Sequence, residues 1–437
     1  MNRTRAQQAP LYRRLPHGPN GMDREEVARN QRARLYGAMI ESIDQRGYRA
    51  TTVAHVISLA GVSRRAFYEL FANKEECFLG TYDIVVASAR KRMLEAWSRE
   101  RGWANRVHAA CKTLLDDAAE SPKGPHLVLV DALGIGPKSR ERLQLAGFTF
   151  ERLVTTAFKA APHEVGFPQL TPRAVVGGVR HIVFVRMLEK REKELFMLTD
   201  EVLDWIESYR TPAAVQLGRT AMVKPPHVPP SPAAFLARED RRAKLLGSVV
   251  HLTLDSGYLN LTDPQIAQFA GVSTEAFHKQ FANKEECFLA VLDEFVNEAV
   301  ESVRPRMEAS STWPEAVYKG VGAFVEYLVA HQALLRIAFI DLFEVGPGMI
   351  GKMTRSVEGF TKLLTENGPE PQRGPAVAQE AITGALWGII CTYVANDRLS
   401  RLPALVDQLA FIVLAPYVGP KAAVETIAAG RKPLRSV

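Results

Sequence analysis

Cysteine is scarce in this sequence, and the patterns that mark metal sites or disulfide scaffolds are missing. The 437 residues include four cysteines, and none of them stands in a Cys-x-x-Cys pair or a Cys/His cluster. Metal sites and disulfide frameworks therefore have little support, and we expect no metal and no cofactor. Reduced thiols are the simplest interpretation, which points to the cytoplasm.

The sequence also lacks a long apolar segment. The longest uncharged apolar run, residues 381–395, is shorter than the roughly 20 residues that a membrane-spanning helix needs. The first residues are basic and never reach the apolar core of a signal peptide. We therefore expect a soluble cytoplasmic protein with no membrane partner.

Patterns of catalytic residues are missing as well. We find no Ser/His/Asp constellation, no glycine-rich loop that could cradle a phosphate and no spacing typical of metal ligands. These absences argue against an enzyme. The net charge is +7, and arginines crowd the front of the chain. This balance mildly favours an anionic partner.

The clearest positive feature is an internal repeat. The nonapeptide FANKEECFL occurs at residues 71–79 and again at 281–289, which is 210 positions later (281 − 71). Later in the chain the register drifts, and Gly178 is matched to Gly384. The chain therefore holds two copies of one unit. Further pairs at the same 210-residue offset are Gly47-Tyr48 and Gly257-Tyr258, Gly61-Val62-Ser63 and Gly271-Val272-Ser273, and Trp103 and Trp313.

Composition and periodicity divide the chain into six segments. A basic mobile arm (1–28) comes first, and a Pro-rich linker (211–235) separates the copies, because its Pro-Pro pairs favour extended chain. Apolar residues recur with helical spacing, as Leu35, Met39 and Ile43 do, and no alternating strand pattern of useful length appears. The predicted fold is all-α, with two domains in each copy at 29–89, 90–210, 236–299 and 300–437.

Two short helices joined by a tight turn predict a helix-turn-helix near the start of each copy. In the first copy Thr52 is a candidate N-cap, Gly61 ends the first short helix, and Ser63 caps the second and can contact a phosphate. The second helix of such a unit lies in the DNA major groove with its first side chains on base edges. Phe67 and Phe71 should point inward and fasten this helix.

Four other side chains of the first copy are further candidates for DNA contacts. Arg64 and Arg65 project from the first helical turn, where a guanidinium fork can bind guanine. Tyr68 is placed to reach the phosphate backbone. Lys74, at the start of the next helix, can add a phosphate contact that positions the protein without specifying a base.

This stretch resembles the DNA-binding domain of the tetracycline-repressor (TetR) family, over about 29–89 and again over 239–299. That family shows a threonine cap, a Gly-Val-Ser turn, a tyrosine in the recognition helix and then F-x-N-K-E-E. The sequence supplies Thr52, Gly61-Val62-Ser63, Tyr68 and Phe71-Ala72-Asn73-Lys74-Glu75-Glu76. The resemblance implies that the motifs 52–71 and 262–281 are the DNA-binding helix-turn-helix units.

The same resemblance implies that a helical domain for ligand binding and dimerisation comes after each motif. The implied function is a sequence-specific transcriptional regulator, in the form of a repressor that a small-molecule effector releases from double-stranded operator DNA. Aromatic residues on apolar helices fit an apolar effector pocket and an ordinary core alike, so no ligand-binding residue is assigned.

The second copy departs from the first in the recognition helix, with STEAFHKQF in place of SRRAFYELF. Over 22–80 nine basic residues face eight acids, whereas over 236–290 six face seven. Two interpretations stay open, which are DNA binding with a different base preference and a vestigial domain that supports the geometry of the pair. The candidate contacts of this copy are Thr262, Ser273, Thr274, Glu275, His278, Lys279 and Lys284.

Three titratable residues lie inside apolar runs. Asp131 and Asp341 are repeated, and a buried carboxylate is costly unless it is paired or hydrogen-bonded. Each could bind a cationic ligand or bond to a neighbouring helix, and recurrence in both copies favours the structural role. His181 is likewise predicted to be a core histidine.

We expect the two copies to pair with each other, so that one chain imitates the family's usual homodimer. As a flexible coil the linker reaches roughly 25–30 Å, and tethering gives the partner an effective concentration of about millimolar. The rival arrangement joins two chains symmetrically through their terminal helices and exposes four reading heads.

Two other functions compete with a regulator. The first is a helical small-molecule carrier or enzyme that has kept the scaffold without operator binding. The second is a sequence-neutral protein that coats the chromosome, which would need stronger and more evenly spread basic charge. DNA binding with and without excess nonspecific competitor separates all three.

Overall fold

The computed structural model describes residues 23–162, 165–212, 217, 233–345, 347–366, 368–369 and 375–431. Strand structure in this part of the chain is one antiparallel pair of two residues each, β1 (Val165–Gly166) and β2 (Thr211–Pro212), and the all-α prediction is confirmed. Of the predicted arm, 1–22 lie outside the described residues, and 24–28 already belong to the first helix. Residues 213–216 and 218–232 of the predicted linker also lie outside them.

The first copy runs from α1 to α9. Its DNA-binding domain ends within α4, and the body comes after it. The elements are α1 (Arg24–Ala50), α2 (Val53–Ala60), α3 (Arg64–Leu70), α4 (Lys74–Arg99), α5 (Trp103–Glu120), α6 (Lys123–His126), the π-helix η1 (Leu127–Asp131), α7 (Pro137–Lys159), α8 (Thr171–Leu188), η2 (Glu192–Met197) and α9 (Thr199–Glu207).

The second copy repeats this order after the short 3-10 turn η3 (Ala234–Ala237). Its elements are α10 (Arg241–Ser256), η4 (Tyr258–Asn260), α11 (Asp263–Phe269), α12 (Thr274–His278), α13 (Lys284–Glu308), α14 (Trp313–Ala330), α15 (Gln332–Arg336), the π-helix η5 (Ile337–Asp341), α16 (Leu342–Val345), α17 (Pro347–Thr365), α18 (Pro375–Ala395), η6 (Leu399–Leu405), α19 (Val406–Val418) and α20 (Pro420–Gly430).

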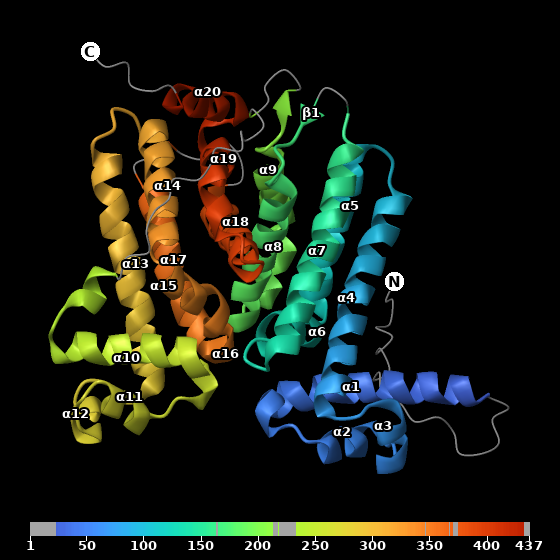
Figure 1. Ribbon diagram of the computed structural model, residues 1–437. Helices are drawn as coiled ribbons and strands as arrows, with labels where there is room; N and C mark the ends of the chain where they lie inside the picture. Colours follow the sequence, from blue (N-terminus) through green and yellow to red (C-terminus); the bar gives the residue numbers. More distant parts are fainter. Residues whose placement is uncertain are drawn as a thin grey trace.

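The two copies lie side by side with their helix-turn-helix units at the same end of the molecule (Figure 1). In the view shown, the first copy is on the right and the second on the left, and α2, α3, α11 and α12 lie along the lower edge. The long helices of both bodies rise from that edge, and α8 and α18 meet in the centre. Two reading heads of one chain therefore face the same way.

A π-helix occurs at the same position of the repeat in both copies. In the first copy, Leu127 and Val128 pack in the core that holds Leu35 and Phe67 of the DNA-binding domain. Val130, two residues later, packs in the core of the body. The π-helix η1 is therefore shared by both cores, and single π turns inside helices often occur at functional sites.

The copies meet where α8 crosses α18, and glycines make the close approach feasible. A Cβ at Gly384 would lie 2.3 Å from His181 Cβ and 2.6 Å from the Gly177 carbonyl oxygen. A Cβ at Gly178 would lie 2.4 Å from the ring of Trp205 on α9. A larger side chain at these positions would therefore push the helices apart.

The register of the repeat in this region is 207, not the 206 that the match of Gly178 to Gly384 implied. Lys190 and Asp397 are the two non-glycine residues with positive φ among those described, at 57° and 53°, and they close equivalent helices 207 positions apart (397 − 190). Gly177 is thus the counterpart of Gly384. The two glycines that touch are equivalent, as in a two-fold crossing.

Polar contacts between the copies accompany the glycine crossing. The guanidinium of Arg186 on α8 binds the carboxylate of Glu380 on α18, and both side chains are largely buried. Burial is the main cause that raises the pKa of Glu380, and the Arg186 guanidinium opposes it. The Gln408 side chain accepts from the Leu170 N–H at 3.0 Å, and the Tyr209 hydroxyl donates to the Ile412 carbonyl at 3.1 Å.

Two segments of the second body, Val377–Ala395 and Leu399–Val418, are long and apolar enough to cross a membrane by length and composition. The helices are longer than the apolar run 381–395 suggested, because α18 starts at Pro375. In each segment, 61% of the most apolar stretch is buried inside the protein. Packing of α18 on α8 and of α19 on α14 and α20 provides that burial.

Candidate nucleic-acid interface

The turn between α2 and α3 has the caps that the sequence predicts. The Thr52 hydroxyl accepts a hydrogen bond from the His55 N–H at 3.3 Å. The His55 ring nitrogen Nδ1 accepts one from the Thr52 N–H, which completes a capping box. Gly61 closes α2 with φ 60°, a left-handed conformation that glycine adopts without strain. The Ser63 hydroxyl accepts from the Ala66 N–H at 3.1 Å and starts α3.

The inner face of α3 is fixed by two phenylalanines. Phe67 is fully buried and Phe71 is 5% exposed, and their rings lie 5.7 Å apart in the core of the first DNA-binding domain. Both inward orientations predicted from the sequence are confirmed. Anchoring on this side leaves the opposite side of α3 outward.

The outward face of α3 carries the predicted contact residues. The Arg65 side chain is 90% exposed, Arg64 is exposed, and Tyr68 is 52% exposed with its ring edge against Phe67. Arg65 Nε lies 3.0 Å from Glu69 Oε1, an exposed pair that contributes little to stability and can be exchanged for another anion. The structure thus brings Ser63, Arg64, Arg65 and Tyr68 onto one free surface.

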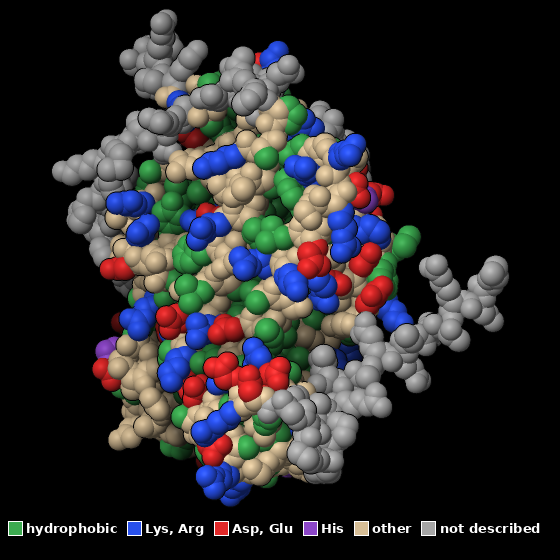
Figure 2. Space-filling model, turned by 90° about the vertical axis from the view of Figure 1, so that its right-hand side faces the viewer, with side chains coloured by type: hydrophobic (Ala, Val, Ile, Leu, Met, Phe, Trp, Pro, Cys, Tyr) green, Lys and Arg blue, Asp and Glu red, His purple; other side chains and the backbone are tan. Residues whose placement is uncertain are grey.

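Figure 2 looks onto the side of the first copy. Lys and Arg side chains are spread over this face among acidic ones, and a group of basic side chains marks the lower end, where Figure 1 has α2 and α3. The basic charge of the body is thus balanced locally.

Arg34 is not part of the exposed basic surface, although the sequence places it in the arginine-rich front of the chain. It is 8% exposed, and its guanidinium donates to the carbonyls of Ala60 (2.9 Å from Nε) and Gly61 (2.7 Å from Nη2). These carbonyls end α2 and have no partner inside the helix. Arg34 therefore fixes the turn. In the sequence, the one sign of this buried position was that Arg34 directly precedes Leu35, a residue of the apolar stripe.

Lys74 also has structural partners that the sequence did not indicate. Its ammonium donates to the carbonyls of Tyr48 (2.9 Å) and Thr51 (2.8 Å) and lies 4.1 Å from the centre of the Tyr48 ring. Burial lowers the pKa of Lys74. The group therefore ties the end of α1 to the start of α4. The sequence did hold a sign of this contact, because both the Gly-Tyr pair and the lysine recur at the 210-residue offset.

The helix-turn-helix of the second copy has the same caps. Thr262 accepts from the Gln265 N–H at 3.4 Å, and Ser273 accepts from the Ala276 N–H at 3.1 Å. Lys284 donates to the carbonyls of Tyr258 (3.3 Å) and Leu261 (2.8 Å), as Lys74 does in the first copy. The scaffold of the motif is thus retained.

The outward face of α12 differs from that of α3. Glu275 and Lys279 form a pair at 2.8 Å, His278 Nε2 lies 3.7 Å from an Asp263 carboxylate oxygen, and Thr274 is half-buried. α12 has five residues where α3 has seven. Lys244, exposed, replaces the buried Arg34, so that the turn lacks this clamp. The second head therefore presents a neutralised face.

The repeated acids Asp131 and Asp341 both end a π-helix and both have cationic neighbours. His126 Nδ1 lies 2.7 Å from Asp131 Oδ2, and Arg336 Nε, at the equivalent position, lies 4.0 Å from Asp341 Oδ2. These contacts support the structural role over a cationic ligand. The hydrogen bond to the Asp131 carboxylate raises the pKa of His126.

The His181 side chain is 12% exposed and lies at the contact between the two copies. Its Nε2 lies 3.6 Å from a carboxylate oxygen of Glu358 in the second copy, and its Cβ lies against Gly384. The sequence predicted a core histidine, and the structure adds that the surface which covers it comes from the second copy. The helical period of α8 could not show it, because the covering surface comes from α17 and α18.

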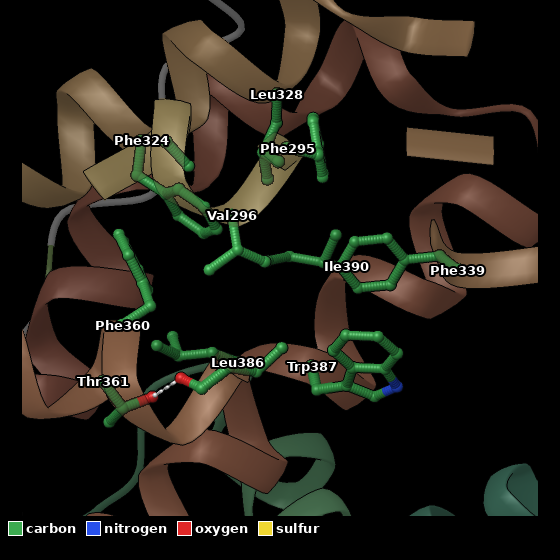
Figure 3. A pocket seen from close by; sticks show the side chains of 12 residues that line it. Phe295, Val296, Phe324, Leu328, Phe339, Phe360, Thr361, Leu386, Trp387 and Ile390 are labelled. Carbon is green, nitrogen blue, oxygen red and sulfur yellow. Dashed lines mark hydrogen bonds between the residues drawn. The ribbon is translucent and has the colours of Figure 1, made fainter. Parts of the chain in front are cut away.

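An apolar pocket opens in the body of the second copy (Figure 3). Its space is about 500 Å³, counted out to the open mouth. Two of the lining residues carry a polar group in their side chains, Thr361 and Trp387. The Thr361 hydroxyl donates to the Val357 carbonyl at 3.2 Å. The lining residues are Phe295, Val296, Ala299, Phe324, Leu328, Phe339, Val357, Phe360, Thr361, Leu386, Trp387 and Ile390.

Comparison with known proteins places these features in a family. The family model described as "Bacterial regulatory proteins, tetR family" matches at residues 37–81 and at 250–291. An HTH-type transcriptional activator, FasR of Mycolicibacterium smegmatis, is 26% identical over 148 residues, which are 33% of this chain and 68% of that protein. An uncharacterised HTH-type transcriptional regulator of Bacillus subtilis, YhgD, is 28% identical over 133 residues, 30% of this chain and 69% of that protein.

Among solved structures, the fatty acid degradation regulator FadR of Bacillus halodurans aligns with a TM-score of 0.35 and 21% identity. The alignment covers 40% of this chain and 96% of that one. The family match falls once in each copy, on the segment that holds the capped turn and the exposed recognition helix. The chain is a tandem member of the tetR family, whose proteins are DNA-binding transcriptional regulators.

Proposed function

We propose that the chain is an operator-specific repressor whose first copy reads the DNA sequence. The observation that carries this is the exposed face of α3, on which Arg64, Arg65 and Tyr68 point outward while Phe67 and Phe71 hold the other side. An arginine fork discriminates guanine through O6 and N7, and each such pair contributes about 1–3 kcal/mol of discrimination.

The second copy supplies the other half of a two-headed reader and adds a different base preference. Its Thr262 and Ser273 caps, and the exposed Lys279, support DNA contact, while Glu275 can accept from cytosine N4. The packing of α8 on α18 inside one chain supports a pseudo-dimer of the two copies over a symmetric homodimer. The operator then consists of two unlike half-sites.

Release from the operator is assigned to an apolar small-molecule effector that binds in the helical body. The apolar lining of the pocket in the second copy supports this assignment. A repressor of this kind needs differential effector affinity between free and operator-bound protein, because coupling between two binding sites is reciprocal.

The test uses footprinting on operator DNA with excess nonspecific competitor. The triple variant Arg64→Ala, Arg65→Ala and Tyr68→Ala should lose the specific footprint, since it removes the base-reading face and leaves the core untouched. The matched variant Thr274→Ala, Glu275→Ala and His278→Ala in the second copy should keep the footprint of one half-site. An unchanged footprint in the first triple variant rules out the assignment.

A helical carrier that has kept the scaffold is the competing function, and the pocket is the observation that favours it. A carrier would bind the apolar ligand without any competitor-resistant DNA complex. The wild-type protein in the same footprinting experiment therefore separates the two functions.

A further inference from the structure

The pocket of the second copy has a chemistry that narrows its ligand. Two ring pairs flank it: Phe324 and Phe360 with centroids 4.2 Å apart, and Phe339 and Trp387 with centroids 4.2 Å apart and planes at 26°. Figure 3 shows Val296, Leu386 and Ile390 between the two pairs. None of the lining residues carries a charge. A charged ligand group placed there would lose its hydration without compensation.

The first copy does not repeat this lining. At the 210-residue offset, Phe295, Phe324 and Phe339 correspond to Val85, Leu114 and Leu129. At the 207-residue offset of the central helices, Trp387 corresponds to Arg180, a half-buried cation. Three of the five ring positions are thus aliphatic in the first copy and one is charged, whereas the fifth, Phe360, is matched by Phe150. The two bodies differ at four of the five ring positions, so they cannot take the same ligand in the same way.

Helix α18 links this pocket to the first copy, because one of its faces lines the pocket and another packs against α8. Leu386, Trp387 and Ile390 line the pocket on one face. On the opposite face Gly384 lies against α8, where an added Cβ would clash with His181 and Gly177. Gly388, four residues after Gly384, also lies against Gly177, whereas Leu386 and Ile390, two and six residues after Gly384, point to the other side and Trp387 lies between the two faces. A ligand that moves the pocket face of α18 therefore presses directly on α8.

The movement has a packed route to the recognition helix. α8 contacts η1, and η1 contacts α1. Leu127 and Val128 of η1 belong to the same core as Phe67, which anchors α3. Because packed cores rearrange between discrete arrangements and do not deform smoothly, a small shift at α18 can be passed on along this chain of contacts.

We propose a division of labour within the chain: the second copy senses an uncharged hydrocarbon or acyl chain in this pocket, and the first copy, which reads the operator, responds through the α18–α8 crossing. This inference rests on the proposed function for its DNA readout. The ligand site itself is argued from the pocket alone. One ligand binds per chain, because the matching lining is built once.

Bromodecane tests the site without DNA, because its bromine quenches the fluorescence of a tryptophan that it touches. The wild-type protein should show saturable quenching with one equivalent of probe per chain. Trp387→Phe should lose this quenching, whereas Trp97→Phe, on α4 of the first copy, should keep it. Bromodecanoate, with the same chain and a carboxylate, should bind at least about tenfold more weakly, since no cation lines the pocket.

A pocket-filling variant keeps the site testable if ring variants fail to fold. Ala299 is 2% exposed and lines the pocket, and Ala299→Leu should abolish quenching while the circular dichroism and melting transition stay those of a folded protein. Two equivalents per chain, unchanged quenching in Trp387→Phe, or equal binding of bromodecanoate would each overturn the assigned site.

The coupling is measured by operator titrations with and without saturating bromodecane. Binding of the probe should change operator affinity at least about fivefold, the lower end of ordinary allosteric coupling. Gly384→Ala should keep the quenching and reduce the coupling. Gly359→Ala, where an added Cβ meets nothing within 4 Å, should alter neither. Quenching without any change in affinity would overturn the coupling and leave the site; absence of operator binding in the unliganded protein would instead refute the proposed function.

Discussion

At the scale of single residues, the sequence shows which side chains cap helices but not which cations bind distant backbone carbonyls. Thr52, Ser63 and Gly61 were predicted in their roles, because caps depend on local spacing that a sequence displays. Lys74 was predicted as a phosphate contact, and Arg34 was counted only among the arginines at the front of the chain. Their donors instead reach backbone carbonyls 23 to 27 residues away. Such contacts depend on tertiary packing, so residue type alone could not reveal them.

Lys74→Met should destabilise the first DNA-binding domain by about 1–3 kcal/mol, because hydrogen bonds from a charged donor to two carbonyls are lost. Chemical denaturation followed by circular dichroism measures this. Lys91→Met on the same helix is the control: its side chain is 77% exposed and 3.8 Å from Glu95, so the cost should stay under about 0.5 kcal/mol. Equal free energies of unfolding for the two variants would show that the Lys74 contacts are unimportant.

The pair of His126 and Asp131 should make the stability of the first copy depend on pH. The hydrogen bond to Asp131 raises the folded pKa of His126 above its unfolded value near 6.5. The stabilisation should therefore be fully present below about pH 6.5 and be lost as the pH rises through the folded pKa. Asp44 and Glu192 add to the raised pKa.

Denaturant unfolding at several pH values, for wild type and His126→Gln, should show a difference that shrinks from acid to alkaline pH. His126→Arg copies the second copy, in which Arg336 stands beside Asp341, and should remove the pH dependence while keeping the charge. A constant difference across the pH range would mean that the imidazole does not titrate in this way.

At the scale of elements, the sequence predicts most helices because apolar residues repeat with helical period. Apolar residues recur with helical period over α7 (Pro137–Lys159) and α18 (Pro375–Ala395), and both segments are helical in the structure. The π-helices were not predicted, because one extra residue in a turn leaves no compositional signal. The crossing of α8 and α18 was also invisible, since the glycines gain meaning only when the partner helix is known.

Gly384→Ala should weaken the packing between the copies and lower the free energy of unfolding by about 1–3 kcal/mol, the usual cost of overpacking. The added methyl group would meet His181 Cβ at 2.3 Å and the Gly177 carbonyl at 2.6 Å. Gly359→Ala is the matched control in α17, where the methyl group meets nothing, and alanine should stabilise that helix by up to about 1 kcal/mol. Thermal and denaturant unfolding of both variants measure the contrast; a gain in stability for Gly384→Ala would contradict the close crossing.

At the scale of the whole molecule, the chain places two copies of one unit side by side, and the copies differ in detail. The repeat and the family motifs were readable in the sequence, and the paired heads at one end agree with them (Figure 1). The difference between the copies was readable at α12, where Glu275 stands in place of Arg65. The location of the pocket in the second body could not be predicted from the sequence, because its lining residues are far apart in the chain and come together only after folding.

The protein should behave as a single chain of 48.4 kDa in light scattering at micromolar concentration. The two copies already pack on each other within the chain, where α8 lies against α18 and Arg186 binds Glu380. Tethering holds the partner copy at an effective concentration of about millimolar, above the concentration of other chains. One chain should then bind one operator with two unlike half-sites, since operator symmetry mirrors protein symmetry. A mass near twice 48.4 kDa together with a palindromic footprint would instead require a symmetric homodimer with four reading heads.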